Sequence, residues 1–198
     1  MCSVQSRRHW FRFSLRALLL AVLVASLPLG WWVRTAHRQR QAVGALRELG
    51  AWVVYDFEYD DGLHTPAAVT GDVPPQWLRR LLGPDLCGNA VQLDWVPFFA
   101  SDDFGSDVTP YLAMLPDMLM VQLIDSSMTD ADLAELRGWS KIEYLMIESE
   151  SVTDKSVDTL RGLRSLKFLS IEKTGISPAG YDRLRTALPG TNVRYQHE

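Results

Sequence analysis

The sequence predicts an α/β fold: a short right-handed β/α solenoid, preceded by an α/β cap and by one N-terminal transmembrane helix. Three observations lead to this prediction. An apolar run stands near the N-terminus, a strand-like alternating segment follows it, and a 24-residue period fills the last third of the chain. The composition agrees, because 47% hydrophobic and 22% charged residues are normal for a folded chain.

The apolar run extends from Ala17 to Val33 and contains no charged residue. At about 1.5 Å per residue it reaches about 25 Å, slightly less than a bilayer hydrocarbon core of about 30 Å. Arg16 and Arg34 flank the run and can extend their charges to the lipid headgroups. The run therefore predicts a single-pass transmembrane helix or signal anchor over residues 15–34.

A cleavable signal peptide is the alternative, with Val24, Ala25 and Ser26 as the cleavage site. The apolar run continues to Val33, which favours an uncleaved anchor. Four arginines precede the run and four follow it before residue 50, so the positive-inside rule does not decide the orientation. The free amine of the basic tail over residues 1–14 favours an extracytoplasmic domain.

The period is carried by pairs of apolar residues spaced by two, each of which predicts a short strand with one buried face. The pairs are Val121 and Leu123, Leu145 and Ile147, and Leu169 and Ile171. A last strand is predicted at Val193–Tyr195. Because no single unit can bury its apolar face alone, the units over residues 111–198 must stack on one another.

A hydroxyl residue follows each predicted strand at the same offset and is a candidate helix N-cap: Thr129, Thr153 and Ser177. Asp130 and Asp154 come next and complement the helix dipole. Pro178 takes that position in the third unit, where proline is favoured at the first residue of a helix.

This pattern resembles the leucine-rich-repeat family, in the bacterial subtype with Ile/Val-Thr-Asp after the strand, over about residues 111–195. The opening from Trp10 to Arg16, followed by leucines, also looks like the start of membrane-anchored bacterial proteins that carry such repeats. The resemblance implies a binding scaffold and no reaction. One position departs from the pattern: Glu150 stands where Ser126 and Thr174 stand in the neighbouring units, and a glutamate replaces a buried hydroxyl poorly.

Residues 35–110 predict a cap for the solenoid, fused to an irregular first repeat. It comprises a helix over residues 36–49, a half-buried strand over residues 52–59 and a short helix over residues 75–82. Val91 and Leu93 repeat the strand pair 30 residues before Val121 and Leu123, which indicates six inserted residues.

Solvent-facing residues of neighbouring strands should align in columns about 4.8 Å apart. The columns are Met120, Tyr144, Phe168 and Asn192; Gln122, Met146, Ser170 and Arg194; and Ile124, Glu148, Glu172 and Gln196. The first three members of the first column are large and apolar, and Met146 and Ile124 flank them. This composition predicts a surface that binds a protein or peptide, unless the cap or a second copy of the chain covers it.

Glu148 and Glu172 form a neighbouring pair, and paired carboxylates can hydrolyse glycosides or bind a cation. We favour two solvated acids, because no third polar group converges on them. The acidic loop at residues 102–107 lacks the spacing of an EF-hand, and the four histidines are scattered. The sequence therefore predicts no catalytic, metal or cofactor site.

The charge is divided unevenly. Residues 1–50 hold eight of the 20 basic residues and one of the 24 acidic ones, which leaves 12 basic and 23 acidic residues in 51–198. So acidic a domain argues against nucleic-acid binding. We expect a non-catalytic, membrane-tethered module that binds on its strand-lined concave face. The alternatives are an envelope component that forms homodimers through Val193–Tyr195, and an enzyme with an unrecognised site.

Overall fold

The computed structural model describes residues 15–57, 74–95, 108–124 and 126–196, without the side chains of residues 16–18 and 21. The basic tail at 1–14 and the acidic loop at 102–107 lie outside the described residues. The chain divides into two units, Met1–Thr35 and Ala36–Glu198. The division falls within helix α1, Leu15–Glu48.

Helix α1 joins the predicted apolar helix and the predicted helix over residues 36–49 into one element of 34 residues, with Pro28 inside it. Among the residues whose side chains are described, no helix is long and apolar enough to cross a membrane. The helix ends in a Schellman motif, in which the Ala51 N–H donates to the Leu46 carbonyl and the Gly50 N–H to the Arg47 carbonyl. Gly50 has a φ of 91°, a conformation that glycine adopts without strain.

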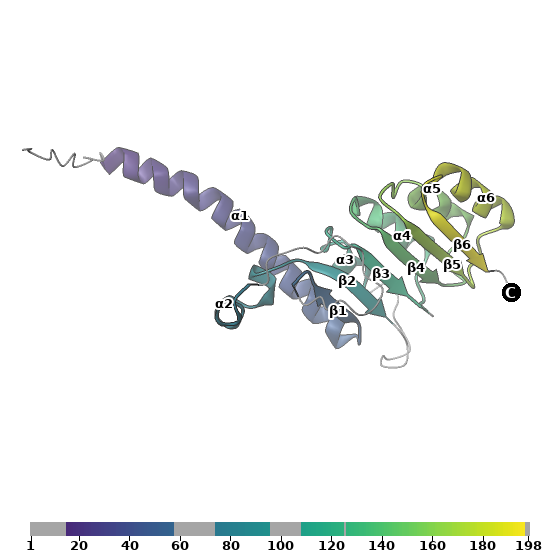
Figure 1. The fold of residues 1–198 in the computed structure, drawn as a ribbon, viewed down its shortest axis with the longest axis horizontal. Coiled ribbons are helices and arrows are strands. Elements are labelled where there is room, and N and C mark those ends of the chain that lie inside the picture. Colours follow the sequence, from purple (N-terminus) through teal and green to yellow (C-terminus); the bar gives the residue numbers. More distant parts are fainter. Residues whose placement is uncertain (1–14, 58–73, 96–107, 125, 197–198) are drawn as a thin grey trace, which may run out of the picture. The chain divides into compact units, whose positions relative to one another are not determined.

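The second unit is built on a six-stranded sheet whose order follows the sequence (Figure 1). The strands are β1 Trp52–Tyr55, β2 Ala90–Trp95, β3 Met120–Leu123, β4 Tyr144–Glu148, β5 Phe168–Glu172 and β6 Asn192–Gln196. Strand β1 is antiparallel to β2, and all later pairs are parallel. The prediction of an α/β fold is confirmed.

From β3 to β6, residues that are 24 positions apart in the sequence are direct partners in neighbouring strands. Met120 pairs with Tyr144, Tyr144 with Phe168, and Phe168 with Asn192. The prediction for β2 was wrong by two residues, since Leu93 and not Val91 pairs with Val121. Val91, Leu93 and Trp95 are all buried, so a shift of two residues leaves the same face inward and the alternation alone does not fix the register.

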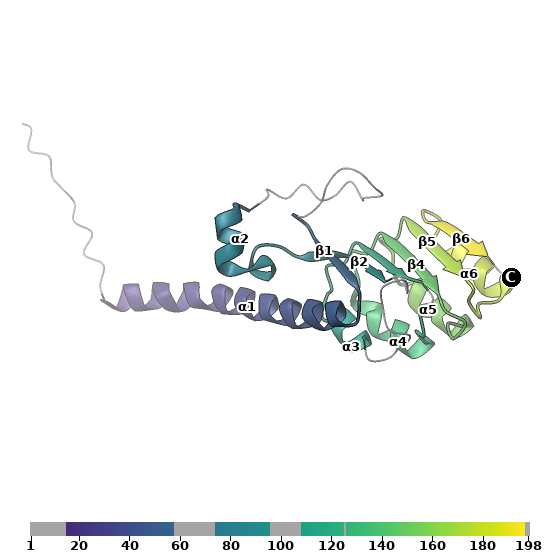
Figure 2. The same cartoon turned by 90° about the horizontal axis from the view of Figure 1, so that it is seen from below.

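One or more helical segments follow each of the strands β1 to β5. The segments that follow β2 and the later strands lie on one side of the sheet (Figure 2). They are α2 Gln76–Leu82, the 3₁₀ helix η1 Pro84–Leu86, α3 Thr109–Leu112, α4 Asp130–Glu135, η3 Leu136–Gly138, η4 Asp154–Ser156, α5 Val157–Leu160 and α6 Pro178–Ala187. Leu133, Leu160 and Leu184 of this layer share one core with the inward residues of the strands and with Val43 and Leu46 of α1.

Thr129, Thr153 and Ser177 are the N-caps of α4, η4 and α6, each accepting a backbone N–H through its side-chain oxygen. Asp132 completes a capping box with Thr129 and also accepts a hydrogen bond of 2.8 Å from the Thr109 hydroxyl. Each of these caps therefore satisfies one of the free N–H groups at the start of its helical segment.

Asp130 and Asp154 bind the cap of the following repeat, a contact beyond the dipole effect predicted for them. Asp130 accepts hydrogen bonds from the backbone N–H of Thr153 at 2.8 Å, from the Thr153 hydroxyl at 2.6 Å and from the Ser156 hydroxyl. Asp154 accepts two from Ser177, at 2.9 and 2.7 Å. We call these contacts the inter-repeat carboxylate bonds.

The hydrogen bonds lower the pKa values of these carboxyls. Burial alone would raise the pKa of Asp130, but the hydrogen bonds from Ser156 and Thr153 hold that pKa below its ordinary value of 3.8. The hydrogen bonds from Ser177 hold the pKa of Asp154 below 3.8 in the same way. Both groups therefore stabilise the fold in their ionised form.

Glu150 is exposed, and the buried hydroxyl of the middle repeat comes from its neighbour Ser149, which donates to the Met128 carbonyl at 2.7 Å. Ser126 donates to the Glu148 carbonyl at 3.2 Å. Glu150 at this position predicted a missing buried hydroxyl in the middle repeat. Ser149, one residue earlier in the chain, supplies this hydroxyl instead. Thr174 keeps a buried hydroxyl without a hydrogen-bond partner.

Replacing Asp130 by asparagine should lower the free energy of unfolding by about 2 kcal/mol, because a carboxylate that accepts three hydrogen bonds becomes an amide facing donors. Urea denaturation followed by circular dichroism measures the change. Asp158→Asn is the control: Asp158 is exposed and has a surface ion pair with Arg161, so the expected change is within about 0.5 kcal/mol. Equal losses for the two variants would contradict the role of the inter-repeat carboxylate bonds.

The stability of the fold should also depend on acid. A carboxyl whose pKa is lower in the folded state contributes its full stabilisation above its unfolded pKa of 3.8, and loses it as the pH falls through the folded pKa. We expect the free energy of unfolding to decrease below pH about 4, and to decrease less steeply in Asp130→Asn. Denaturation series at several pH values measure both slopes, and parallel curves would contradict the assignment to Asp130.

Candidate functional site

The predicted columns are rows of direct neighbours on the face of the sheet opposite α3–α6, which we call the open face. The register aligns Met120, Tyr144, Phe168 and Asn192 in one row, and Gln122, Met146, Ser170 and Arg194 in the next. A third row holds Glu148, Glu172 and Gln196. Ile124 lies just after β3, half-buried and outside the paired register, so the row predicted for it begins at Glu148.

The open face is less exposed than predicted. Met120 is only 6% exposed and Ser170 only 1%. Met120 lies between Gln92 and Tyr144 in its row, and the short Ser170 lies between the longer side chains of Met146 and Arg194. The prediction that the side chains of these two residues face solvent was wrong.

On β4 and β5, Tyr144, Met146 and Phe168 form a compact apolar patch of half-buried side chains, which we call the aromatic patch. The rings of Tyr144 and Phe168 are stacked, with centroids 6.3 Å apart and planes 29° from parallel. The alternating residues Leu145, Ile147 and Leu169 point into the core. The patch therefore sits on a rigid base and presents two flat rings and a flexible thioether side by side.

Glu148 and Glu172 are neighbours, but each has its own cation. The Lys173 amine lies 3.5 Å from Glu148, and the Arg194 guanidinium lies 3.6 Å from Glu172, which also accepts a hydrogen bond from Ser170. The two carboxylates are therefore compensated, and they do not resemble the free acid and base pair of a glycosidase. Among the described residues, no group of three metal-ligating side chains is found.

The sequence reasoning missed two residues at the β1 side of the open face. Trp52 is 70% exposed and lies opposite Asp94, which in turn neighbours Gln122. Burial raises the pKa of Asp94, although Gln92 donates a hydrogen bond of 2.7 Å to its Oδ2. The alternation of β1 and β2 indicates that Trp52 and Asp94 face away from the core, but the two-residue error in register hid that Asp94 meets Gln122 of β3.

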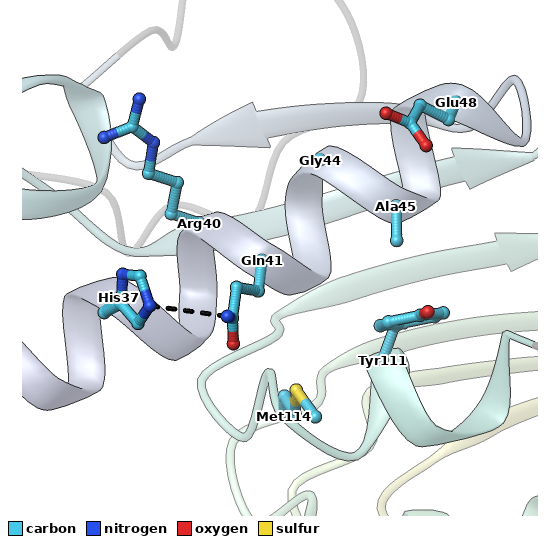
Figure 3. A pocket seen from close by; sticks show the side chains of 8 residues that line it. All are labelled: His37, Arg40, Gln41, Gly44, Ala45, Glu48, Tyr111 and Met114. Atoms are coloured by element: carbon cyan, nitrogen blue, oxygen red, sulfur yellow. Dashed lines mark hydrogen bonds between the residues drawn. The ribbon is translucent and has the colours of Figure 1, made fainter.

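A groove of about 580 Å³ lies on the other part of the unit, between α1 and the segment around α3 (Figure 3). Its lining residues are His37, Arg40, Gln41, Gly44, Ala45, Glu48, Tyr111 and Met114. His37 contacts Gln41 at 3.3 Å, and Arg40 and Glu48 lie at opposite ends of the groove. The polar groups do not converge on one point, as the side chains of a catalytic or ligand site would.

No known protein family matches this chain, and no curated protein is similar to it.

Proposed function

We propose that this protein is a membrane-tethered, non-catalytic interaction module that binds a protein or peptide on the open face of its sheet. The observation that carries the proposal is the aromatic patch. Stacked Tyr and Phe rings beside a methionine, on a face that none of the described helices covers, have the composition of an interface centre. The charged residues of the neighbouring row would form a polar rim around it.

We also propose that the chain is a member of the leucine-rich-repeat family and forms a short right-handed solenoid. The support is the 24-residue spacing of three strands and three caps, together with parallel strands in sequential order. In such a fold each repeat contacts only its neighbours, and side chains of one row come from equivalent positions.

Membrane attachment is proposed from the uninterrupted apolar run of the sequence between Ala17 and Val33. Its described side chains include several that are more than half exposed: Leu19, Leu20, Val22, Leu23, Val24, Leu27, Leu29 and Trp31. Water would solvate such a helix poorly, whereas lipid would cover it. We propose a single-pass attachment with the sheet domain on the extracytoplasmic side.

Self-association through β6 is the alternative function, and the position of β6 at the sheet edge favours it. The Asn192 N–H donates to Lys167, so by alternation the Val193 N–H points to the free edge. Against it, Tyr181 donates to the Val193 carbonyl at 3.3 Å and its ring stacks on Tyr195. These contacts protect part of the edge, and we therefore favour binding at the open face.

The open-face proposal can be tested with peptides. Peptides selected from a random library against the full-length chain in detergent micelles should lose about 100-fold in affinity for the double variant Tyr144→Glu, Phe168→Glu, because two central aromatic contacts are lost. Fluorescence anisotropy measures the affinities, and circular dichroism checks the fold.

The charge-matched control is Arg164→Gln with Arg185→Gln, which makes the same change in net charge at exposed residues of the helical side. The control should keep its affinity. Peptides that bind the double variant as tightly as the unmodified chain, or a selection that yields no binding peptide, would contradict the proposal.

The alternative has its own test. Val193→Pro removes an outward N–H and should leave the mass of the detergent-solubilised chain unchanged if the open face is the functional surface. Light scattering over a range of concentrations measures this mass. A concentration-dependent dimer that is lost in Val193→Pro would instead support self-association through β6.

A further inference from the structure

Helix α2 carries an apolar face that the described part of the protein leaves uncovered. Trp77 is 66% exposed and Leu81 is 73% exposed, and no residue of this helix is buried. The two residues are four positions apart, so they lie on the same side of the helix. Arg80 is exposed beside them.

The other side of α2 packs against the rest of the second unit. The Arg79 guanidinium lies 5.2 Å from the centre of the buried Phe57 ring, and Leu78 is half-buried. In η1, which follows directly, Asp85 accepts a hydrogen bond of 2.6 Å from the Tyr55 hydroxyl. Trp77 and Leu81 are thus presented outward from a fixed helix.

The segment after η1 lies at the end of the second unit where the chain enters it. The Gln39 side chain donates to the Gly88 carbonyl at 2.8 Å and accepts from the Ala90 N–H at 3.2 Å. Gln39 is three residues, or about 4.5 Å of helix, from Ala36, where the unit begins. The apolar run of the sequence ends at Val33, directly before this point.

Trp52, the first residue of β1, lies beside the C-terminal end of α1, away from Ala36. It follows Ala51, whose N–H donates to Leu46, and the Arg47 side chain donates to the Val53 carbonyl at 3.1 Å. Leu46 is ten residues, or about 15 Å of helix, from Ala36. Trp52 and Trp77 therefore lie toward opposite ends of the part of α1 that belongs to the second unit. Their side chains are nearly equally exposed, at 70% and 66%.

The charges at the entry end differ from those of the rest of the unit. Arg38, Arg40 and Arg80 are exposed there, whereas residues 51–198 as a whole hold 23 acidic and 12 basic residues. The described acids near this end, Asp56 and Asp85, are half-buried and accept hydrogen bonds. Exposed arginines at the same end of the unit as an exposed tryptophan and leucine match an anionic lipid surface.

We infer that α2 is a second membrane contact, with Trp77 and Leu81 inserted into the interfacial layer of the bilayer that holds the apolar run and with Arg80 among the headgroups. This inference rests on the proposed membrane attachment. Tryptophan is enriched at the boundary between headgroups and acyl chains, because its ring is apolar and its indole N–H still finds polar partners there.

The test uses the full-length chain in vesicles of phosphatidylcholine and phosphatidylglycerol, with some acyl chains brominated close to the headgroup. Bromine quenches the fluorescence of tryptophans that reach the acyl chains. Trp77→Phe should reduce the quenched part of the emission, whereas the matched variant Trp52→Phe should reduce only the unquenched part. Leu81→Glu should shift Trp77 emission from the quenched to the unquenched part, and circular dichroism checks that each variant is folded.

Flotation of the vesicles separates this inference from the proposal on which it rests. A chain that floats with the vesicles while Trp77→Phe reduces only the unquenched emission would overturn the role of α2 and leave the membrane attachment standing. A chain that does not float would overturn the attachment, and the inference with it.

Discussion

The architecture depends on contacts that join each repeat to the next. A single strand and its helical segment cannot bury their apolar faces, so the unit is stable only as a stack. Backbone pairing holds the strand side of the stack, and the inter-repeat carboxylate bonds hold the helical side, where Asp130 binds the cap Thr153 and Asp154 binds the cap Ser177. Both sides impose the same 24-residue step, so the repeats cannot shift against one another without breaking bonds on both sides.

The contact between neighbouring repeats also restricts which residue can stand three positions after each cap. Ser156 donates to Asp130, and the equivalent residue of the last repeat is Gly180. A side chain at Gly180 would collide with the Asp154 carboxylate. Pro178 occupies the position that Asp130 and Asp154 occupy in the two preceding repeats. In the described residues no later helix cap follows that a carboxylate at this position would bind. The composition of each repeat thus reflects what the next repeat must contact.

The same step gives the open face its chemistry. Residues at equivalent positions of neighbouring repeats are brought side by side, which makes Tyr144 and Phe168 a stacked pair and places Glu148 beside Glu172. The carboxylates would repel each other, but Lys173 and Arg194 compensate them. The row therefore remains polar without becoming a free pair of acids, and it borders the aromatic patch on one side.

The sequence by itself determined the class of fold, the 24-residue period, the caps and the rows of the open face between β3 and β6. It could do so because equivalent apolar and capping residues recur at a fixed step of 24, and this step is the register between neighbouring strands. It did not determine the register of β2, since a strand whose alternate residues are all apolar can shift by two without exposing its core face.

Only the tertiary structure decided which outward side chains are accessible. Met120 and Ser170 are buried although they belong to the outward rows, and Trp52 and Asp94 join the open face through the pairing of β1 with β2. The structure also revealed that Asp130 and Asp154 reach across to the next repeat. These features arise from contacts between residues distant in sequence, whose geometry no local pattern of side chains contains.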